Sequence, residues 1–312
     1  MQKIITVVVP TYKHENRMND LLNLVESLTV ISNLEYIYEI LVVDNGSSLD
    51  KESDCLKFLS HKRVRIVDEP CIGLNYARNT GIAVASAEII AFLDDDVIVS
   101  PTWAESIISG HRNIGVLCVG GPVNIRNKML CYPAWFSEYF LRFLLPMSFP
   151  KASGQLSPPY FLIGANMSFK KGVFEKYGTF DPFLDRKGDN LLSNGDLEFI
   201  IRLPQNSVRF EVGAIASEEI KENRLTRSFS VRRVFWQGIS DAIMVRKRGL
   251  HNFYDRNEVF LNRHFVRKFV SASVHRNFFE AFCALVRLAA YKYKTIFLKL
   301  KKRGRIFPPL FR

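Results

Sequence analysis

The first hundred residues alternate between short apolar runs and segments whose apolar residues recur at helical spacing. The runs are "IITVVVP", "YEILVVDN", "VRIVDEP" and "IIAFL". Helical spacing places Leu21, Leu22, Val25 and Leu28 on one face, and further helices are expected around Asp50–Leu59 and over "NYARNTGIAVASA". Apolar strands that alternate with amphipathic helices indicate βαβ units. We therefore predict an α/β fold with a mostly parallel sheet flanked by helices.

Polar side chains follow each of the four apolar runs, at the point where the predicted strand ends. They are Thr11 and Tyr12, Asp44, Asp68 and Glu69, and Asp94 to Asp96. Right-handed crossovers bring the carboxyl ends of parallel strands to one edge of the sheet, where open α/β sheets bind ligands. Loops are polar in any case, which accounts for a single such end. Four ends with carboxylates or hydroxyls favour a ligand site.

The pattern changes near Gly120. The segment "MLCYPAWFSEYFLRFLLPMSF" is strongly aromatic, and a helix packed on the sheet is the favoured interpretation. A mobile flap or a membrane-facing surface is the alternative. Further on, "SNGDLEFIIRL" opens a helix with Asp196 and Glu198 in its first turn, where the helix dipole favours carboxylates.

Composition narrows the class of protein. Of the 312 residues, 47% are hydrophobic and 24% charged, which is typical of a globular chain. The net charge of +12 is concentrated from Lys221 to Arg312, and such a region attracts nucleic acid, anionic lipid or phosphorylated substrates. We expect two domains, residues 1–225 with a nucleotide-binding half 1–119 and an acceptor half 120–225, and a helical basic region 226–312.

Several classes are disfavoured by what the sequence lacks. The five cysteines form no CxxC pair and are odd in number, which indicates reduced thiols rather than disulfides or a zinc site. The sequence has no signal-peptide h-region and no apolar run of about 18 residues, so a cytoplasmic protein is expected. Walker, dinucleotide-binding, nucleophile-elbow and H-E-x-x-H motifs are also missing.

Five blocks in a fixed order resemble the inverting glycosyltransferases of family 2, which have the GT-A fold. They are "VVVPTYKHENRM", "ILVVDNGSS", "GLNYARNTGIAVASAEIIAFLDDD", "FLIGANMSFKK" and "NGDLEFIIRL", within about residues 4 to 240. The resemblance implies a Rossmann-like sheet and a nucleoside diphosphate sugar as donor, with uridine the usual base.

The resemblance also assigns a nucleoside pocket. The residues at the matching positions are Pro10, Thr11, Tyr12, Glu15, Asp44 and Arg78. Asp44 matches the carboxylate that accepts a hydrogen bond from the base. Arg78 matches a basic residue near the pocket, although its spacing alone is equally consistent with an arginine on a helix surface.

The aspartate triplet matches the D-x-D element of the family. Asp96 is implied as the metal ligand, with Asp94 or Asp95 reaching the ribose or the water shell of the metal. Mg²⁺ or Mn²⁺ prefers oxygen ligands and can stabilise a departing diphosphate as a Lewis acid. A solvated acidic turn is the alternative interpretation.

The implied catalytic base is Asp196, which would take the proton of the acceptor hydroxyl. Relatives carry an E-D or D-D pair here, whereas this chain has Gly195 before the aspartate. Asp196 could also cap its helix. Glu218 stands about where relatives often place a histidine of the metal or diphosphate site. These two departures leave open an inactive nucleotide-sugar-binding scaffold as the rival function.

The segment "RLTRSFSVRRVFWQG" resembles an arginine-rich loop of family members. Arg224 and Arg227 could clamp the diphosphate, because guanidinium groups match phosphate oxygens. Arg233 and Trp236, together with Glu198, could form the acceptor side. A solvated basic helix is the plain alternative.

The basic C-terminal region predicts an amphipathic helix. Phe278, Phe282, Leu285, Leu288 and Ala289 fall on one face, and lysines and arginines crowd toward the end. This pattern favours a helix lying in the membrane interface. A helix packed on the catalytic domain is the alternative, and nucleic-acid binding is not expected without a recognisable module. We therefore expect a peripheral enzyme on the inner face of the cell membrane that glycosylates a lipid-linked or saccharide acceptor in surface polysaccharide synthesis.

Overall fold

A computed structural model describes residues 4–12, 18–46, 62–127, 131–144, 149–156, 162–247, 270 and 277–302. The chain forms two compact units. The first comprises Met1–Leu130, Leu145–Gly188 and Gly195–Ile220, and the second comprises Cys131–Leu144, Asp189–Asn194 and Lys221–Arg312. The helix expected around Asp50–Leu59 and the candidate residue Glu15 lie outside the described residues.

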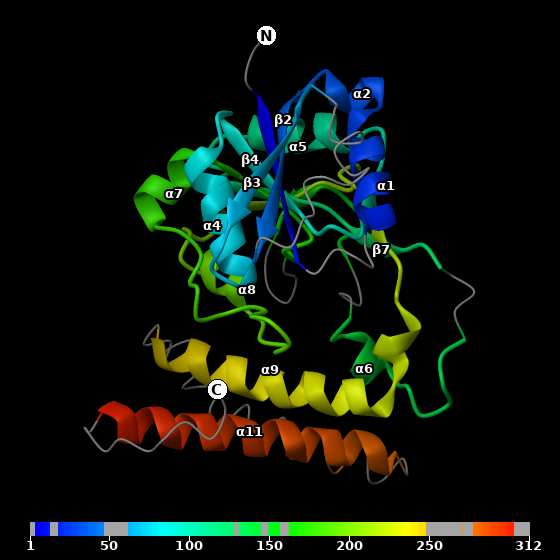
Figure 1. The fold of residues 1–312 in the computed structure, drawn as a ribbon, viewed down its shortest axis with the longest axis vertical. Helices are drawn as coiled ribbons and strands as arrows, with labels where there is room; N and C mark the ends of the chain where they lie inside the picture. Colours follow the sequence, from blue (N-terminus) through cyan, green and yellow to red (C-terminus); the bar gives the residue numbers. More distant parts are fainter. Residues whose placement is uncertain are drawn as a thin grey trace. The chain divides into compact units, whose positions relative to one another are not determined.

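The first unit is built on an eight-stranded sheet with the strand order β3-β2-β1-β4-β9-β6-β10-β8 (Figure 1). Neighbouring strands are parallel except where β9 and β8 run against their partners. The mostly parallel α/β sheet predicted from the apolar runs is confirmed, and it is consistent with the GT-A fold. The strands are β1 (Ile5–Thr11), β2 (Ile37–Asn45), β3 (Val64–Glu69), β4 (Ile89–Leu93), β6 (Cys118–Gly120), β8 (Gly154–Gln155), β9 (Asn166–Lys170) and β10 (Val208–Phe210).

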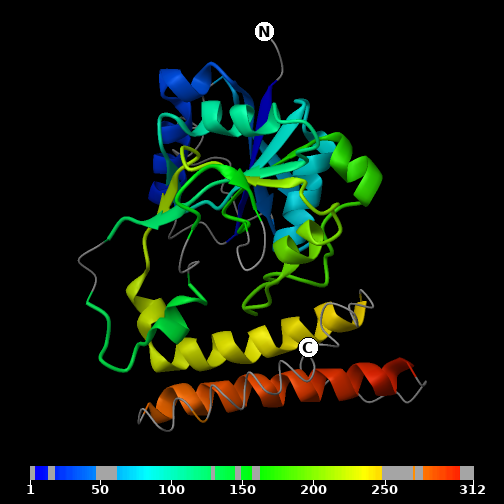
Figure 2. The ribbon, with the colours of Figure 1, turned by 180° about the vertical axis from the view of Figure 1, so that it is seen from behind.

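Helices cover this sheet, and Figures 1 and 2 show α4 and α1 on opposite sides of the parallel strands. A Cβ atom built on Gly81 of α4 would lie 2.3 Å from Cγ1 of Val8 in β1, so only glycine allows this close approach of helix and strand. The helices of this unit are α1 (Met18–Thr29), α2 (Ile31–Leu34), α4 (Leu74–Val84), α5 (Trp103–His111), α7 (Gly172–Tyr177) and α8 (Gly195–Ile200).

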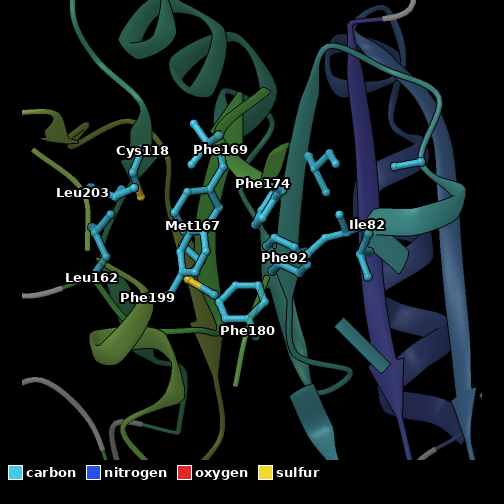
Figure 3. Packing of buried hydrophobic residues seen from close by; sticks show 14 of the residues in the cluster. Ile82, Phe92, Cys118, Leu162, Met167, Phe169, Phe174, Phe180, Phe199 and Leu203 are labelled. Carbon is cyan, nitrogen blue, oxygen red and sulfur yellow. The ribbon is translucent and has the colours of Figure 1, made fainter. Parts of the chain in front are cut away.

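An aromatic cluster holds α8 against the sheet (Figure 3). Phe92 of β4 and Phe169 of β9 contact Phe180, whose ring centroid lies 4.8 Å from that of Phe199 in α8. All four side chains are almost fully buried. Burial of rings of this size is a large part of a core's free energy. The cluster therefore fixes the start of α8, where Asp196 lies.

A three-stranded sheet follows the aspartate triplet. Its order is β5 (Val97–Val99), β11 (Ala216–Glu218) and β7 (Val123–Ile125). In the antiparallel pairing of β5 with β11, Glu218 lies opposite Val97. The backbone of Glu218 is thereby placed beside the triplet, although more than a hundred residues separate the two in sequence.

The second unit is helical. Its elements are α6 (Glu138–Leu141), the 3-10 helix η2 (Glu222–Leu225), α9 (Arg227–Lys247) and α11 (Phe278–Lys302). The helices α9 and α11 lie side by side (Figures 1 and 2), and a Cβ atom on Gly238 would lie 3.0 Å from that of Ala290. No helix in the described part of the chain is long and apolar enough to span a membrane.

The aromatic segment that we expected to pack on the sheet belongs to the core of this second unit. Tyr139 and Phe140 are buried together with Val234 of α9 and Cys283 of α11. The ring of Trp135 packs edge-on against Phe279 at 5.0 Å between centroids. Burial is confirmed for the middle of the segment, whose partners are the two long helices, whereas Tyr132 is exposed. Among the described residues of the segment, only Phe149, at its end, packs on the sheet as expected, where its ring stacks on that of Phe210 in β10.

Candidate active site

The ends of the parallel strands form one row of polar side chains. Thr11 of β1 pairs in register with Asp44 of β2, which in turn pairs with Asp68 of β3. The Oγ1 hydroxyl of Thr11 donates a hydrogen bond of 2.8 Å to Oδ2 of Asp95. The sheet thus brings together, at one edge, residues from four separate parts of the sequence, as the strand pattern predicted.

One end of this row has an apolar wall. A Cβ atom on Gly46 would lie 3.5 Å from Cε2 of Tyr12 and 3.3 Å from Cγ1 of Ile72, so these two side chains flank the turn after β2. Asn45 holds the loop that carries Ile72, because its amide donates to the carbonyl of Cys71 at 2.7 Å and its Oδ1 accepts the Gly73 N–H at 2.8 Å. An aromatic and an aliphatic side chain beside a buried carboxylate suit a planar, polar-edged base.

Pro10 and Asp44 complete the predicted nucleoside residues that the structure describes. Pro10 is buried in β1 opposite Val43. Asp44 is fully buried at the end of β2. The contacts of both residues with a nucleoside, and the hydrogen bond from the base to Asp44, stay predictions.

The aspartate triplet is mostly enclosed. Asp95 and Asp96 are buried, Asp94 is half-buried, and the interpretation as a solvated turn is therefore wrong for two of the three. Glu218 is also buried, and its backbone pairs with Val97, the residue that follows the triplet. Among the described residues, no three His, Cys, Asp or Glu side chains gather closely enough to hold a metal ion by themselves.

Arg78 lies in the interior, so its interpretation as a surface arginine is wrong. It is only 3% exposed, and its guanidinium forms an ion pair of 2.8 Å with Oδ2 of Asp185. It also donates to Oδ1 of Asn75 at 3.1 Å and lies over the ring of Phe180. A Cβ atom on Gly164 would lie only 2.1 Å from Nη2 of Arg78, so the guanidinium also abuts the Gly164 backbone.

Two backbone donors orient the carboxylate of Asp196. The N–H of Gly164 donates to its Oδ2 at 2.8 Å, and the N–H of Leu197 donates to its Oδ1 at 2.7 Å. The side chain is half-buried, so part of it stays open to solvent. Asp196 is the second residue of α8 and therefore lies inside the first turn rather than at the cap position, and the bond from Leu197 fixes a carboxylate that is partly open to solvent. Glu198, in contrast, is fully buried and forms an ion pair of 3.0 Å with Arg202.

The predicted diphosphate and acceptor residues Arg224, Arg227, Arg233 and Trp236 all belong to the second unit. Within it, the guanidinium of Arg227 lies 5.3 Å from the ring centroid of Phe279, and that of Arg233 lies 5.6 Å from that of Phe143. Trp236 packs edge-on against Phe235. Their action on a substrate stays a prediction, as does that of Glu198.

Three residues of the site were not found from the sequence. Ile72 stands in a loop without a periodic pattern, and Asn45 is the last residue of β2, next to the turn at Gly46. Asp185 lies ten residues before Gly195 in a loop, and its carboxylate accepts the Gly195 N–H at 3.0 Å. Burial, opposed by the charge of Arg78 and assisted by that of Asp196, raises the pKa of Asp185 to about 6.

Known proteins share this sequence pattern. The family model described as glycosyl transferase family 2 matches residues 6–178, more than half of the chain. A glucosyl-dolichyl phosphate glucuronosyltransferase of Haloferax volcanii is 28% identical over 247 residues, which cover 77% of each chain. A pre-mycofactocin glycosyltransferase of Mycobacterium tuberculosis is 26% identical over 249 residues, which cover 78% of this chain and 48% of that protein.

Proposed function

Because this chain belongs to glycosyl transferase family 2 and is a glycosyltransferase, we propose that it moves a sugar with inversion from a UDP-sugar to an acceptor hydroxyl, with Asp196 as the base. The observation that carries the proposal is the Asp196 carboxylate, which two backbone N–H groups orient and which stays partly open to solvent. A general base needs this combination of fixed geometry and access.

The proton and electron pairs balance in a single displacement. The carboxylate of Asp196 takes the proton of the acceptor hydroxyl while the hydroxyl oxygen forms a bond to the anomeric carbon. The bond from that carbon to the diphosphate oxygen breaks on the opposite face, and its electron pair stays with the UDP leaving group. Attack from the opposite face inverts the configuration at the anomeric carbon.

The donor would bind along the row of strand ends. Asp44 is proposed to accept a hydrogen bond from the base, and Tyr12 and Ile72 to enclose its ring faces. The hydroxyl of Thr11 donates a hydrogen bond to Asp95, and this bond is proposed to fix the position of the aspartate triplet.

The carboxylates fit a divalent cation by their chemistry. Mg²⁺ and Mn²⁺ take oxygen ligands and are commonly held by one or two carboxylates together with substrate phosphates. Asp96 and Glu218 are proposed to supply such a pair of carboxylates, since Glu218 pairs with Val97, the residue after Asp96, and the half-buried Asp94 is the third candidate ligand. When bound, the cation would act as a Lewis acid on the departing diphosphate.

We further propose a lipid-linked acceptor, in assembly of a surface polysaccharide, reached from an anionic membrane surface. The name of the Haloferax relative specifies transfer to glucosyl-dolichyl phosphate, itself a lipid-linked sugar. In this chain, the face of α11 that does not pack on α9 is apolar, with two exposed lysines. Its exposed residues are Phe278, Phe282, Leu285, Ala289, Lys292, Tyr293, Ile296 and Lys299. An apolar face with lysines suits the headgroup region of an anionic bilayer.

Calorimetric titration with UDP, with and without Mn²⁺, tests the donor site. We expect binding that depends on Mn²⁺ and is lost in Asp96→Ala. Asp196→Asn should keep UDP binding but stop the release of UDP from a panel of UDP-sugars. If the wild-type chain bound no nucleotide under any metal condition, the rival function as a degenerate scaffold would replace the proposal.

Vesicle sedimentation tests the membrane surface. The full chain should sediment with vesicles that contain phosphatidylglycerol at physiological salt and stay in solution with vesicles of phosphatidylcholine alone. Phe282→Asp should weaken sedimentation, because it places a charge within the apolar face. Ile114→Asp is the matched control, since Ile114 is fully exposed in the first unit. Equal binding of both variants would exclude the α11 face.

A further inference from the structure

Asp185 is a buried carboxylate to which the proposed reaction assigns no role. It is 7% exposed, and its two oxygens contact Arg78 at 2.8 Å and the N–H of Gly195 at 3.0 Å. Its backbone has a φ of 62°, in the left-handed region that favours glycine over residues with a side chain. An aspartate in this conformation is strained, and such strain persists where surrounding contacts impose it.

Gly195 is a glycine at a position whose backbone does not require one. Its φ is not positive, so the backbone conformation does not require glycine, and glycine is a poor residue within a helix. The space around it explains the choice. A Cβ atom at this position would lie 2.2 Å from Oδ2 of Asp185 and 2.4 Å from Nδ2 of Asn75. The carboxylate of Asp185 therefore fills the space that a side chain at position 195 would occupy.

The backbone at position 185 would accept glycine more readily than aspartate, and the helical backbone at position 195 would accept aspartate more readily than glycine. We propose that Asp185 supplies, from a loop, the carboxylate that an acidic residue at position 195 would otherwise place next to Asp196, and that it acts as a positioning residue for the base. This inference rests on the proposed function, since it gives Asp185 its purpose through Asp196.

The contacts show how the positioning works. Asp185 holds the first N–H of α8 through Gly195 and fixes the guanidinium of Arg78. Arg78 lies against Gly164, whose N–H binds Asp196. Both backbone segments that flank the base therefore meet the ion pair formed by Asp185 and Arg78.

The charge of Asp185 should also act electrostatically on the carboxylate of Asp196. The charged groups that act on Asp185 are Arg78 from α4, Asp196 from α8 and the adjacent Arg186. Burial raises the pKa of Asp185 to about 6, so a negative charge appears beside Asp196 as the pH rises through this value. An uncharged residue that only filled this space would produce no such electrostatic signal.

Exchange of the two residues tests the placement. Asp185→Gly removes the partner of Arg78, and Gly195→Asp introduces overlapping atoms, so each single variant should lower Tm on the order of 10 °C. The double variant Asp185→Gly/Gly195→Asp should recover at least half of that loss, because it relieves the strain and returns a carboxylate to the same space. Asp181→Gly is the matched control from the same loop and should not rescue Gly195→Asp. A double variant no more stable than the weaker single variant would overturn the proposal.

A second measurement tests the effect on the base without turnover. In protein labelled with carbon-13 at the aspartate carboxyls, the Asp196 signal is identified by its loss in Asp196→Asn. In the wild-type chain this signal should show an inflection near pH 6 that disappears in Asp185→Asn. Absence of the inflection would refute a positioning role. Since neither readout uses turnover, failure of the wild-type chain to release UDP would count against the proposed function alone.

Discussion

Arg78→Met tests the electrostatics of the site most directly. The substitution keeps a long apolar side chain over Phe180 and removes the charge that pairs with Asp185. Both groups are buried, and removal of one partner of a buried ion pair typically costs about 3–5 kcal/mol, because the remaining charge is left uncompensated. We expect a loss of this size in the free energy of unfolding near pH 7.5.

The loss should depend on pH in a defined direction. The pKa of Asp185 is about 6 in the folded chain and 3.8 ordinarily, so its contribution to stability falls by about 3 kcal/mol as the pH rises from the lower to the higher value. Arg78 lowers the folded pKa, and the variant will raise it further. Near pH 5 the carboxyl is protonated in both proteins. The cost of Arg78→Met should therefore shrink there, by about 1.4 kcal/mol for each unit of additional pKa rise.

Urea unfolding of both proteins near pH 7.5 and near pH 5 gives the two free-energy differences. Arg65→Met is the matched control. Arg65 forms an ion pair of 3.3 Å with Glu39 while half exposed, and such pairs contribute about 1 kcal/mol or less. A cost for Arg78→Met that was equal at both pH values, or no greater than that of the control, would refute the assignment of a buried, titrating ion pair.

Three further outcomes follow from the packing. Burial lowers the pKa of His111 to about 3, so the chain should lose about 3 kcal/mol of stability from this residue as the pH falls from 6.5 to about 4.5, and urea unfolding should show that His111→Gln escapes this loss. Gly81→Ala should cost about 1–3 kcal/mol in the same assay, since the new methyl would overlap Val8. Arg287→Met should speed proteolysis of α11, because it breaks a two-point contact with Asp241 at 3.0 and 2.7 Å.

The fold of the N-terminal half could be predicted because its signals are local. Apolar runs such as Ile89–Leu93 are buried on both faces, and their period differs from that of the helices between them. Later elements gave weaker signals. Strands β6, β7, β10 and β11 have three residues each, which is too few for a periodic pattern. Their positions are fixed by pairing with distant segments, which sequence reading does not see.

The candidate site likewise contains residues that local sequence signals locate and residues whose surroundings depend on distant segments. Thr11, Asp44 and the aspartate triplet could be located because parallel strands end at one edge, and Asp196 because a helix starts there. The environment of Arg78 could not, since its burial depends on a loop more than a hundred residues away in sequence. Glu198 shows the opposite failure of the sequence pattern. The pattern suggested a residue of the acceptor site close to the base, whereas its buried side chain forms an ion pair with Arg202.

A short chain of hydrogen bonds connects the strand edge proposed to bind UDP with the start of α8, where Asp196 lies. A substitution in this chain should therefore affect both places. Asn45, at the end of β2, accepts the N–H of Gly73 at 2.8 Å, and the next N–H, that of Leu74, donates to the carbonyl of Arg186 at 2.8 Å. Asp185, next to Arg186, then binds the start of α8. The first residues of α4 therefore tie the strand edge to the loop that holds Asp196. A substitution at Asn45 should disturb both UDP binding and turnover, whereas a change confined to Asp196 should affect turnover alone.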